Sequence, residues 1–132
     1  MHKLFLISAL LLVLSLPAAA LATSGTATAP GLSVSVSLSP DTAANGDTVT
    51  ASESVTNTSG TKQSVVITNT LADPTGGTVT RTKRVVLKPG EAFTQTATYL
   101  VDPTDARGTY TLSVTASAQS GTATASAHVT YV

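Results

Sequence analysis

The sequence has no cysteine and no tryptophan, and charged residues make up only 11% of its 132 residues. Without cysteine the chain can have neither a disulfide framework nor a lipid anchor on a modified cysteine. The formal net charge is zero, and no basic stripe of the kind that binds nucleic acid is present. No window repeats apolar residues at the helical spacing of three and four, so we expect a fold without helices.

The first 22 residues have the features of a secretory signal. Residues 2–3 are basic, and residues 4–16 form an apolar run that is short of the about 20 residues needed to span a bilayer. Residues 20–22 have the small-x-small pattern of a signal peptidase site. We therefore predict a signal peptide over residues 1–22 and a secreted or periplasmic product with no membrane span after cleavage. The alternative is an uncleaved membrane anchor.

What the remaining chain does contain is alternation. Apolar residues recur at every second position in seven short segments, which indicates half-buried strands separated by Gly, Pro, Asn and Asp turns. Residues 23–31 are small and polar and end in Pro-Gly, so they are predicted to be a disordered leader. Residues 32–132 are predicted to be an all-β domain, a seven-stranded antiparallel immunoglobulin-like (fibronectin type III-like) sandwich. The predicted strands are 32–38, 47–57, 63–72, 78–87, 92–101, 108–117 and 122–132.

Three expectations follow from this assignment. Tyr110 comes directly after the polar turn at 102–108, as in a tyrosine corner, where the hydroxyl ties a loop to a strand. Tyr99, Tyr110 and Tyr131 are expected to point inward. The last hairpin is lined with Ala on its inner side, so that end of the fold is predicted to be the least stable.

Several turn and core motifs resemble repeats of bacterial surface proteins. They include Asn45-Gly46-Asp47 followed by Thr48-Val49, then Val55-Thr56-Asn57, and later Leu87-Lys88-Pro89-Gly90-Glu91. Together they resemble the cell-adhesion-related domain found in bacteria and its immunoglobulin-like relatives, over nearly the whole chain after residue 22. The resemblance implies an extracellular sandwich that serves as a spacer or an adhesive module.

Acidic residues are predicted to gather at one end of the sandwich. Asp41, Asp73, Asp102 and Asp105 all fall in turns that the expected topology brings to the same pole, and Asp47 lies close by. Converging carboxylates could bind Ca²⁺ through oxygen ligands. The alternative is that each Asp caps its own turn by accepting backbone N–H groups. Because no spaced Asp-x-Asp-x-Asp loop is present, we predict no metal and no cofactor.

Glu53 breaks the apolar alternation of its predicted strand. In phase it would face inward, where an unpaired carboxylate is costly. It could pair with Arg81 or Lys83, which interrupt another strand with the same parity, but a bulge near Ser52 that turns Glu53 outward is favoured.

For the other residues that could have a functional role, the sequence also allows a purely structural explanation. His128 is predicted to be an exposed strand residue because no partner motif accompanies it. Asn57-Thr58-Ser59 is a glycosylation sequon. The Thr-rich runs 78–82 and 94–98 lie on two strands that are expected to pair. They could form one hydroxyl array there, or they could be ordinary solvated strand residues.

These observations favour an exported, non-enzymatic module that binds or scaffolds through a sheet edge, a sheet face or a loop pole. Unpaired edges, expected at the first, fourth and seventh predicted strands, could accept a partner strand. The alternatives are a secreted enzyme inhibitor, such as a protease inhibitor, and a carbohydrate-binding or adhesive domain. The expected partner is a protein or a surface polysaccharide, and neither nucleic acid nor catalysis is expected.

Overall fold

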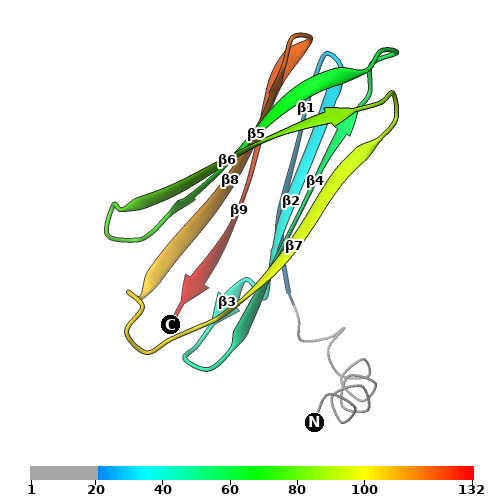
Figure 1. The fold of residues 1–132 in the computed structure, drawn as a ribbon. Coiled ribbons are helices and arrows are strands. Elements are labelled where there is room, and N and C mark those ends of the chain that lie inside the picture. Colours follow the sequence, from blue (N-terminus) through cyan, green and yellow to red (C-terminus); the bar gives the residue numbers. More distant parts are fainter. Residues whose placement is uncertain (1–20) are drawn as a thin grey trace, which may run out of the picture.

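The computed structural model describes residues 21–132, and the predicted signal peptide lies almost wholly outside them. The described chain is all-β, with nine strands in two facing sheets (Figure 1). None of its segments is a helix long and apolar enough to cross a membrane. The strands are β1 (Thr23–Ala29), β2 (Leu32–Ser39), β3 (Thr42–Ala43), β4 (Thr48–Asn57), β5 (Gln63–Ala72), β6 (Thr78–Leu87), β7 (Ala92–Leu100), β8 (Gly108–Ala118) and β9 (Gly121–Tyr131).

The two sheets have four and five strands. The first has the order β1-β2-β4-β7 and the second the order β3-β9-β8-β5-β6. All neighbours are antiparallel except the short β3, which runs parallel to β9. Alternate side chains of β2, β4, β5, β8 and β9 face the space between the sheets and form the core. The all-β sandwich is thus confirmed, but the strand count of seven is wrong.

The predicted disordered leader is a strand. β1 pairs with β2 along its whole length, from Thr23 opposite Leu38 to Ala29 opposite Leu32. The Pro30-Gly31 pair is the turn of this hairpin, and Gly31 takes the positive φ of 80° that glycine allows. β1 also lies against β9, where the Thr23 hydroxyl accepts a hydrogen bond from the His128 N–H at 2.9 Å. These polar residues are ordered because their backbone groups are paired on one side and packed on the other.

The strands at 78–87 and 92–101 were expected to pair with each other, and this expectation is wrong. β6 pairs with β5 in one sheet, and β7 pairs with β4 in the other. The intervening turn crosses between the sheets because Asn57 holds it at the end of β4. The Gly90 N–H donates to the Asn57 carbonyl at 2.8 Å, and the Asn57 N–H donates to the Glu91 carbonyl at 3.0 Å. The two Thr-rich runs therefore belong to separate surfaces, and no joint hydroxyl array forms.

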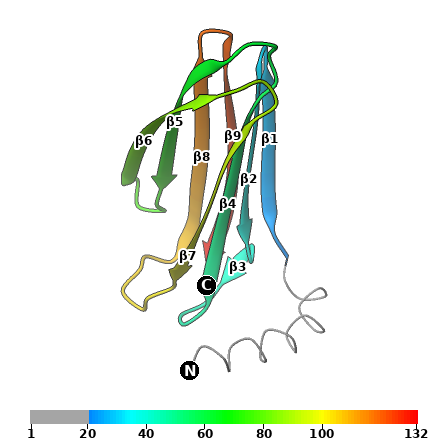
Figure 2. The same ribbon diagram turned by 45° about the vertical axis from the view of Figure 1, so that its right-hand side comes forward.

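The sandwich is closed along one side and open along the other. On the closed side β1 and β2 pack against β9. On the open side β6 and β7 meet only near their connecting turn and then diverge (Figure 2). Burial follows this asymmetry: β2 and β9 bury alternate residues, whereas most residues of β6 and β7 are exposed on both faces. Of the three expected edges, only the one formed by β6 is wholly free, because β1 covers β2 and both β1 and β3 lie along β9.

Candidate functional site: the open groove between β6 and β7

A groove runs along the open side of the sandwich. It has a mainly apolar part of about 520 Å³. A more polar part of about 500 Å³ continues from it, and both parts share Glu53, Asn69, Arg81 and Gln95. The groove exists because the diverging edges leave the interior between the sheets uncovered.

The apolar part of the groove is lined by side chains that alternation assigns to a core. Leu71, Val79 and Leu112 come from the five-stranded sheet, and Ala97 and Tyr99 come from β7. Leu71 is 39% exposed, Val79 is 59% exposed and Tyr99 is 51% exposed. Tyr99 points into the space between the sheets, as expected, but it is half exposed because no strand within residues 21–132 covers this side of β7. The wider end of the groove therefore offers apolar surface to solvent.

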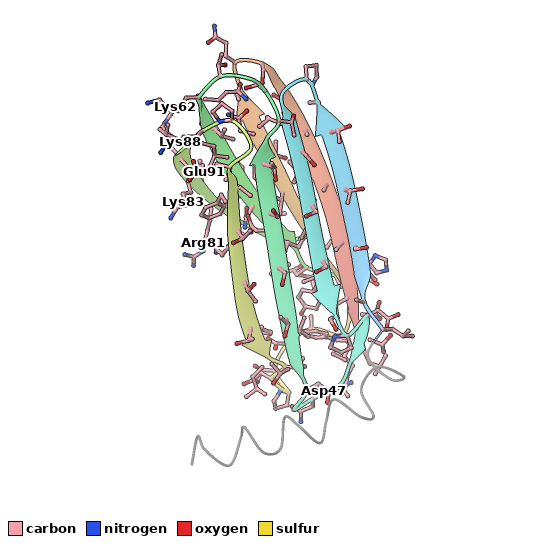
Figure 3. The ribbon with its side chains drawn as sticks, turned by 90° about the vertical axis from the view of Figure 1, so that its right-hand side faces the viewer. Asp47, Lys62, Arg81, Lys83, Lys88 and Glu91 are labelled. Carbon is pink, nitrogen blue, oxygen red and sulfur yellow. The ribbon has the colours of Figure 1, made fainter. Side chains whose placement is uncertain are left out.

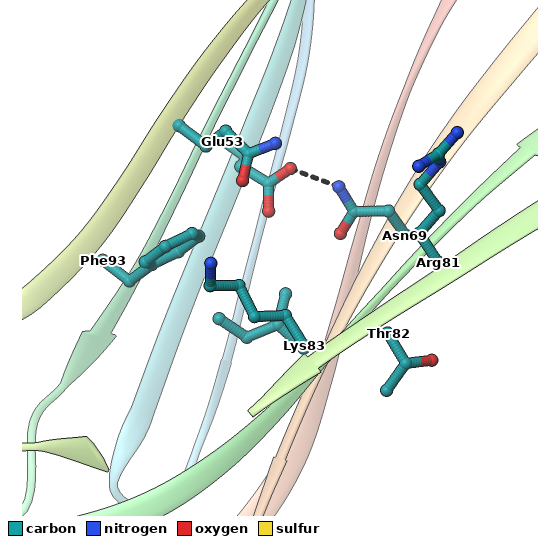
Figure 4. A pocket seen from close by; sticks show the side chains of 8 residues that line it. Glu53, Asn69, Arg81, Thr82, Lys83 and Phe93 are labelled. Atoms are coloured by element: carbon teal, nitrogen blue, oxygen red, sulfur yellow. Dashed lines mark hydrogen bonds between the residues drawn. The ribbon is translucent and has the colours of Figure 1, made fainter. Parts of the chain in front are cut away.

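Glu53 forms the floor where the two parts meet. It is buried, and β4 keeps an unbroken register with β2 and β7 on either side of it. The favoured outward bulge near Ser52 is therefore wrong, because nothing interrupts the ladder that turns Glu53 inward. Its Oε1 accepts a hydrogen bond from the Asn69 side chain, while its Oε2 is buried without a partner (Figure 4). Burial raises the pKa of the Glu53 carboxyl, and the Asn69 bond offsets part of this rise.

Replacing Glu53 by Gln should stabilise the protein at neutral pH by about 1 kcal/mol, because the unpaired buried oxygen then carries no charge. The pKa of Glu53 is raised above 4.5 in the folded state. The contribution of Glu53 to the free energy of unfolding is therefore most favourable below the pKa of the unfolded chain, and it is lost as the pH rises through the folded pKa. The gain from Glu53→Gln should therefore vanish near pH 3.5 and be complete at pH 7. Urea unfolding at both pH values measures it, and a gain of equal size at both would contradict this account.

Cations line the edge of the groove. Arg81 and Lys83 extend from β6 on the groove side, and both are exposed. The Lys83 Nζ lies 5.5 Å from the centre of the Phe93 ring on β7, so it reaches across the groove toward the opposite edge (Figure 4). Lys62 and Lys88 lie on the same side of the molecule, and Glu91 is the one labelled carboxylate among these four cations (Figure 3). This edge of the molecule is therefore positive.

The acidic residues do not assemble a cation site. Among residues 21–132 no three His, Cys, Asp or Glu side chains lie close enough together to hold a metal ion. Asp73 Oδ1 accepts from the Thr75 N–H, the Thr75 hydroxyl and the Gly77 N–H, and these bonds lower the pKa of Asp73. Asp102 has the same arrangement with Thr104, whose hydroxyl lowers the pKa of Asp102.

Asp105, Asp47 and Asp41 also serve local structure. Asp105 Oδ2 accepts from the Asp102 N–H at 2.9 Å and from the Tyr99 hydroxyl at 2.7 Å. The second bond raises the pKa of Tyr99 to about 12. Asp47 accepts from the Ala44 N–H at 2.8 Å, and Asp41 bonds through its backbone. The hydrogen bonds therefore support the turn-capping alternative for Asp47, Asp73, Asp102 and Asp105, but within the described part of the chain the Asp41 side chain caps no turn.

The remaining candidates have structural roles or remain exposed. The Tyr110 hydroxyl donates to the Ala106 carbonyl at 2.7 Å, which confirms the tyrosine corner. His128 is exposed on β9, as expected. Asn57, the acceptor residue of the sequon, is fully buried and its amide is engaged in hydrogen bonds within the fold.

Sequence reasoning did not identify the groove. The sequence pattern gives Asn69, Leu71 and Val79 no role beyond their strands, since alternation predicts which face a side chain occupies but not whether that face is covered. One available signal was that Glu53, Arg81 and Lys83 interrupt two apolar faces with the same parity. These three residues do line one pocket, although Glu53 pairs with Asn69.

No family model and no curated protein matches the chain. Solved structures resemble it in fold. A β-glucosidase from Listeria innocua superposes with a TM-score of 0.55 at 19% identity, covering 76% of this chain and 16% of that chain. The β-glucosidase EmGH1 from Erythrobacter marinus gives 0.53 at 19% identity, covering 83% of this chain and 16% of that one. The alkylpurine DNA glycosylase AlkC from Pseudomonas fluorescens, bound to DNA, gives 0.50 at 16% identity, with 70% and 28% covered.

The chain thus spans only a small part of the proteins it resembles. At identities below 20% the likeness concerns the fold alone, and fold does not carry activity with it.

Proposed function

We propose that this chain is an exported, non-enzymatic binding module built on an immunoglobulin-like sandwich, and that it binds its ligand in the open groove. The single observation that carries the proposal is the uncovered interior between β6 and β7. Soluble proteins seldom leave core side chains such as Val79 and Tyr99 half exposed unless a partner covers them. Concave, largely apolar sites with a few polar groups are the usual form of a binding pocket.

The strand arrangement supports the immunoglobulin-like part of the proposal. Seven of the nine strands correspond to the expected seven, and they divide as β2, β4 and β7 against β5, β6, β8 and β9. In the constant immunoglobulin arrangement the fourth strand joins the first sheet. Here its counterpart, β6, joins the second sheet, which favours the fibronectin type III-like variant. Export is supported by the basic start and apolar run of residues 1–22.

A carbohydrate ligand is the second candidate. It is favoured by Tyr99, whose half-exposed ring lies in the groove with its hydroxyl fixed by Asp105. An aromatic ring of this kind offers an apolar face and a polar tip to a ligand.

The proposal is tested by binding at the groove with a matched pair of variants. Val79 and Val86 lie on the same strand and are 59% and 58% exposed, but only Val79 lines the groove. The full chain is expressed in a bacterial host, and the exported product is titrated by NMR with a panel of extended peptides and oligosaccharides. We expect saturable shifts of β6 and β7 amides for at least one ligand class, with an about tenfold loss of affinity in Val79→Gln and little change in Val86→Gln.

Either of two results would overturn the proposal. One is that no ligand class gives saturable shifts at the groove. The other is that Val86→Gln weakens binding as much as Val79→Gln. Retention of the product inside the host would overturn the export part alone.

A further inference from the structure

The free edge of β7 leaves backbone groups available to another strand. In the β4–β7 ladder the Val101 N–H donates to the Asp47 carbonyl at 2.9 Å, and the Glu91 carbonyl accepts from Asn57 at 3.0 Å. In an antiparallel ladder alternate residues bond to the partner and those between them point away. The odd-numbered residues of β7 therefore bond to β4, whereas Thr94, Thr96 and Thr98 direct their N–H and C=O groups outward into solvent.

From this edge we propose that the groove accepts one extended polypeptide strand of a partner protein, which pairs with β7 and places an acidic side chain beside Arg81 and Lys83. The inference rests on the proposed function and names the ligand of the same groove. An added strand would continue the four-stranded sheet, since β7 is its last member. Its inward side chains would enter the space that β6 and β7 leave uncovered.

The side chains of the groove predict the pattern of that strand. Inward residues of an added strand stand opposite Gln95, Ala97 and Tyr99, because successive side chains alternate between faces. Opposite Ala97 and Tyr99 the groove is lined by Leu71 and Val79, so these two positions call for apolar residues. Opposite Gln95 the more polar part of the groove is lined by Arg81 and Lys83, so this position calls for Asp or Glu. The ligand pattern is apolar-x-apolar-x-acidic, read along the groove from its wide end, beside Tyr99, toward the turn that connects β6 and β7.

Glu53 sets the balance of charge at the acidic position. Glu53 lines the groove, and the charge of its buried, unpaired carboxylate opposes a second carboxylate there, but Arg81 and Lys83 outnumber it. This arrangement yields opposite predictions for two neutral substitutions. Glu53→Gln should tighten the binding of an acidic strand, and Lys83→Gln should weaken it. A basic ligand would respond in the reverse sense.

A second copy of the chain is a poorer occupant. Edge-to-edge pairing of two copies would place β7 beside β7, and residues 92–100 contain no Asp or Glu to meet Arg81 and Lys83. A sugar chain would leave the outward N–H and C=O groups of Thr94, Thr96 and Thr98 without their regular partners. The acidic strand satisfies the backbone edge, the apolar lining and the cations together.

The test uses the exported product and synthetic peptides. The probe is acetyl-Thr-Val-Thr-Val-Thr-Glu-Thr-amide together with its reversed sequence, so that both strand directions are sampled, and matched peptides carry Gln or Lys in place of Glu. Affinity is measured by calorimetry at low salt, and protection of the Thr94, Thr96 and Thr98 amides by hydrogen exchange. We expect the Glu peptide to bind at least tenfold more tightly than the Lys peptide and to protect these three amides.

Backbone pairing is tested separately. Thr96→Pro removes an N–H that points away from β4, a position that an edge strand tolerates, and it should weaken binding at least tenfold. Thr96→Val keeps the N–H and should bind as the parent does. Peptides with an N-methyl group at single alternate positions make the same test from the ligand side, so a folding defect in Thr96→Pro does not decide the result.

The outcomes separate this inference from the proposed function. Equal binding of the Lys peptide, no effect of N-methylation, or weaker binding in Glu53→Gln would overturn the acidic strand. If an oligosaccharide then binds with the same dependence on Val79, the binding module stands and only its ligand is different. If sedimentation shows a dimer that Thr96→Pro dissolves, the occupant is a second copy and the inference is wrong. If no ligand binds, both proposals fail.

Discussion

Replacing Asn57 by Ala should lower the free energy of unfolding by about 3 kcal/mol. Asn57 is fully buried, and its side chain takes part in five hydrogen bonds. Its Nδ2 donates to the carbonyls of Thr61 at 2.8 Å and Leu87 at 2.9 Å. Its Oδ1 accepts from the N–H and hydroxyl of Ser59 and from the Gln63 side chain. Alanine would leave several of these buried groups without partners, which costs more than the bonds themselves contribute.

The structural effect should concentrate at the turn between β6 and β7, because the Asn57 amide and backbone together hold that crossover. Asn57→Asp has the same shape but cannot donate, so it should cost about as much as alanine and would assign the loss to hydrogen bonding. Asn45 is exposed, and Asn45→Ala should stay within about 0.5 kcal/mol of the parent. Urea unfolding of the three variants measures these differences, and a loss in Asn57→Ala no larger than that in Asn45→Ala would contradict the assignment.

Replacing Gly25 by Ala should destabilise the protein by about 2 kcal/mol and loosen β1. At Gly25 the backbone of β1 lies directly on β9. An added Cβ would overlap the Ser126 carbonyl oxygen and lie 3.0 Å from the Ser126 nitrogen. Neither contact can be relieved by turning a side chain, so β1 has to move away from β9.

Gly60 provides the matched control for this substitution. A Cβ there meets nothing within 4 Å, and Gly60 has no positive φ. Gly60→Ala should therefore be neutral or slightly stabilising, since it reduces the freedom of the unfolded chain. Thermal unfolding compares the two variants, and hydrogen exchange of β1 amides localises the effect. If Gly25→Ala unfolds at the same temperature as Gly60→Ala, the close contact between β1 and β9 is contradicted.

Strand positions were predictable from the sequence because alternation is a local property. The strands at 63–72 and 78–87 have the predicted bounds, and the others differ by one or two residues. Sheet membership was not predictable in the same way. The period of two locates residues 78–87 as a strand but does not specify whether β5 or β7 lies beside it. The leader was misassigned because Pro30-Gly31 can end a polar tail or turn a hairpin, and only packing on β9 distinguishes the two.

The candidate site was only partly predictable for a related reason. Alternation predicts that Val79, Ala97 and Tyr99 face inward, and the sequence shows that Glu53 interrupts the apolar pattern of its strand. Whether an inward side chain is buried depends on a neighbouring strand, and residues 21–132 supply none on the open side. The groove is a property of two edges that diverge, and no local pattern encodes that divergence.

The free edge of β7 also affects how the protein behaves at high concentration. Natural sheets usually protect such rims with lysine, proline or a bulge, because unprotected strands nucleate fibrils. β6 carries Arg81, Lys83 and Arg84, but residues 92–100 contain neither a charged residue nor a proline. At high concentration this unprotected edge therefore favours edge-to-edge association of two copies, and a strand of another protein paired with β7 would prevent that association.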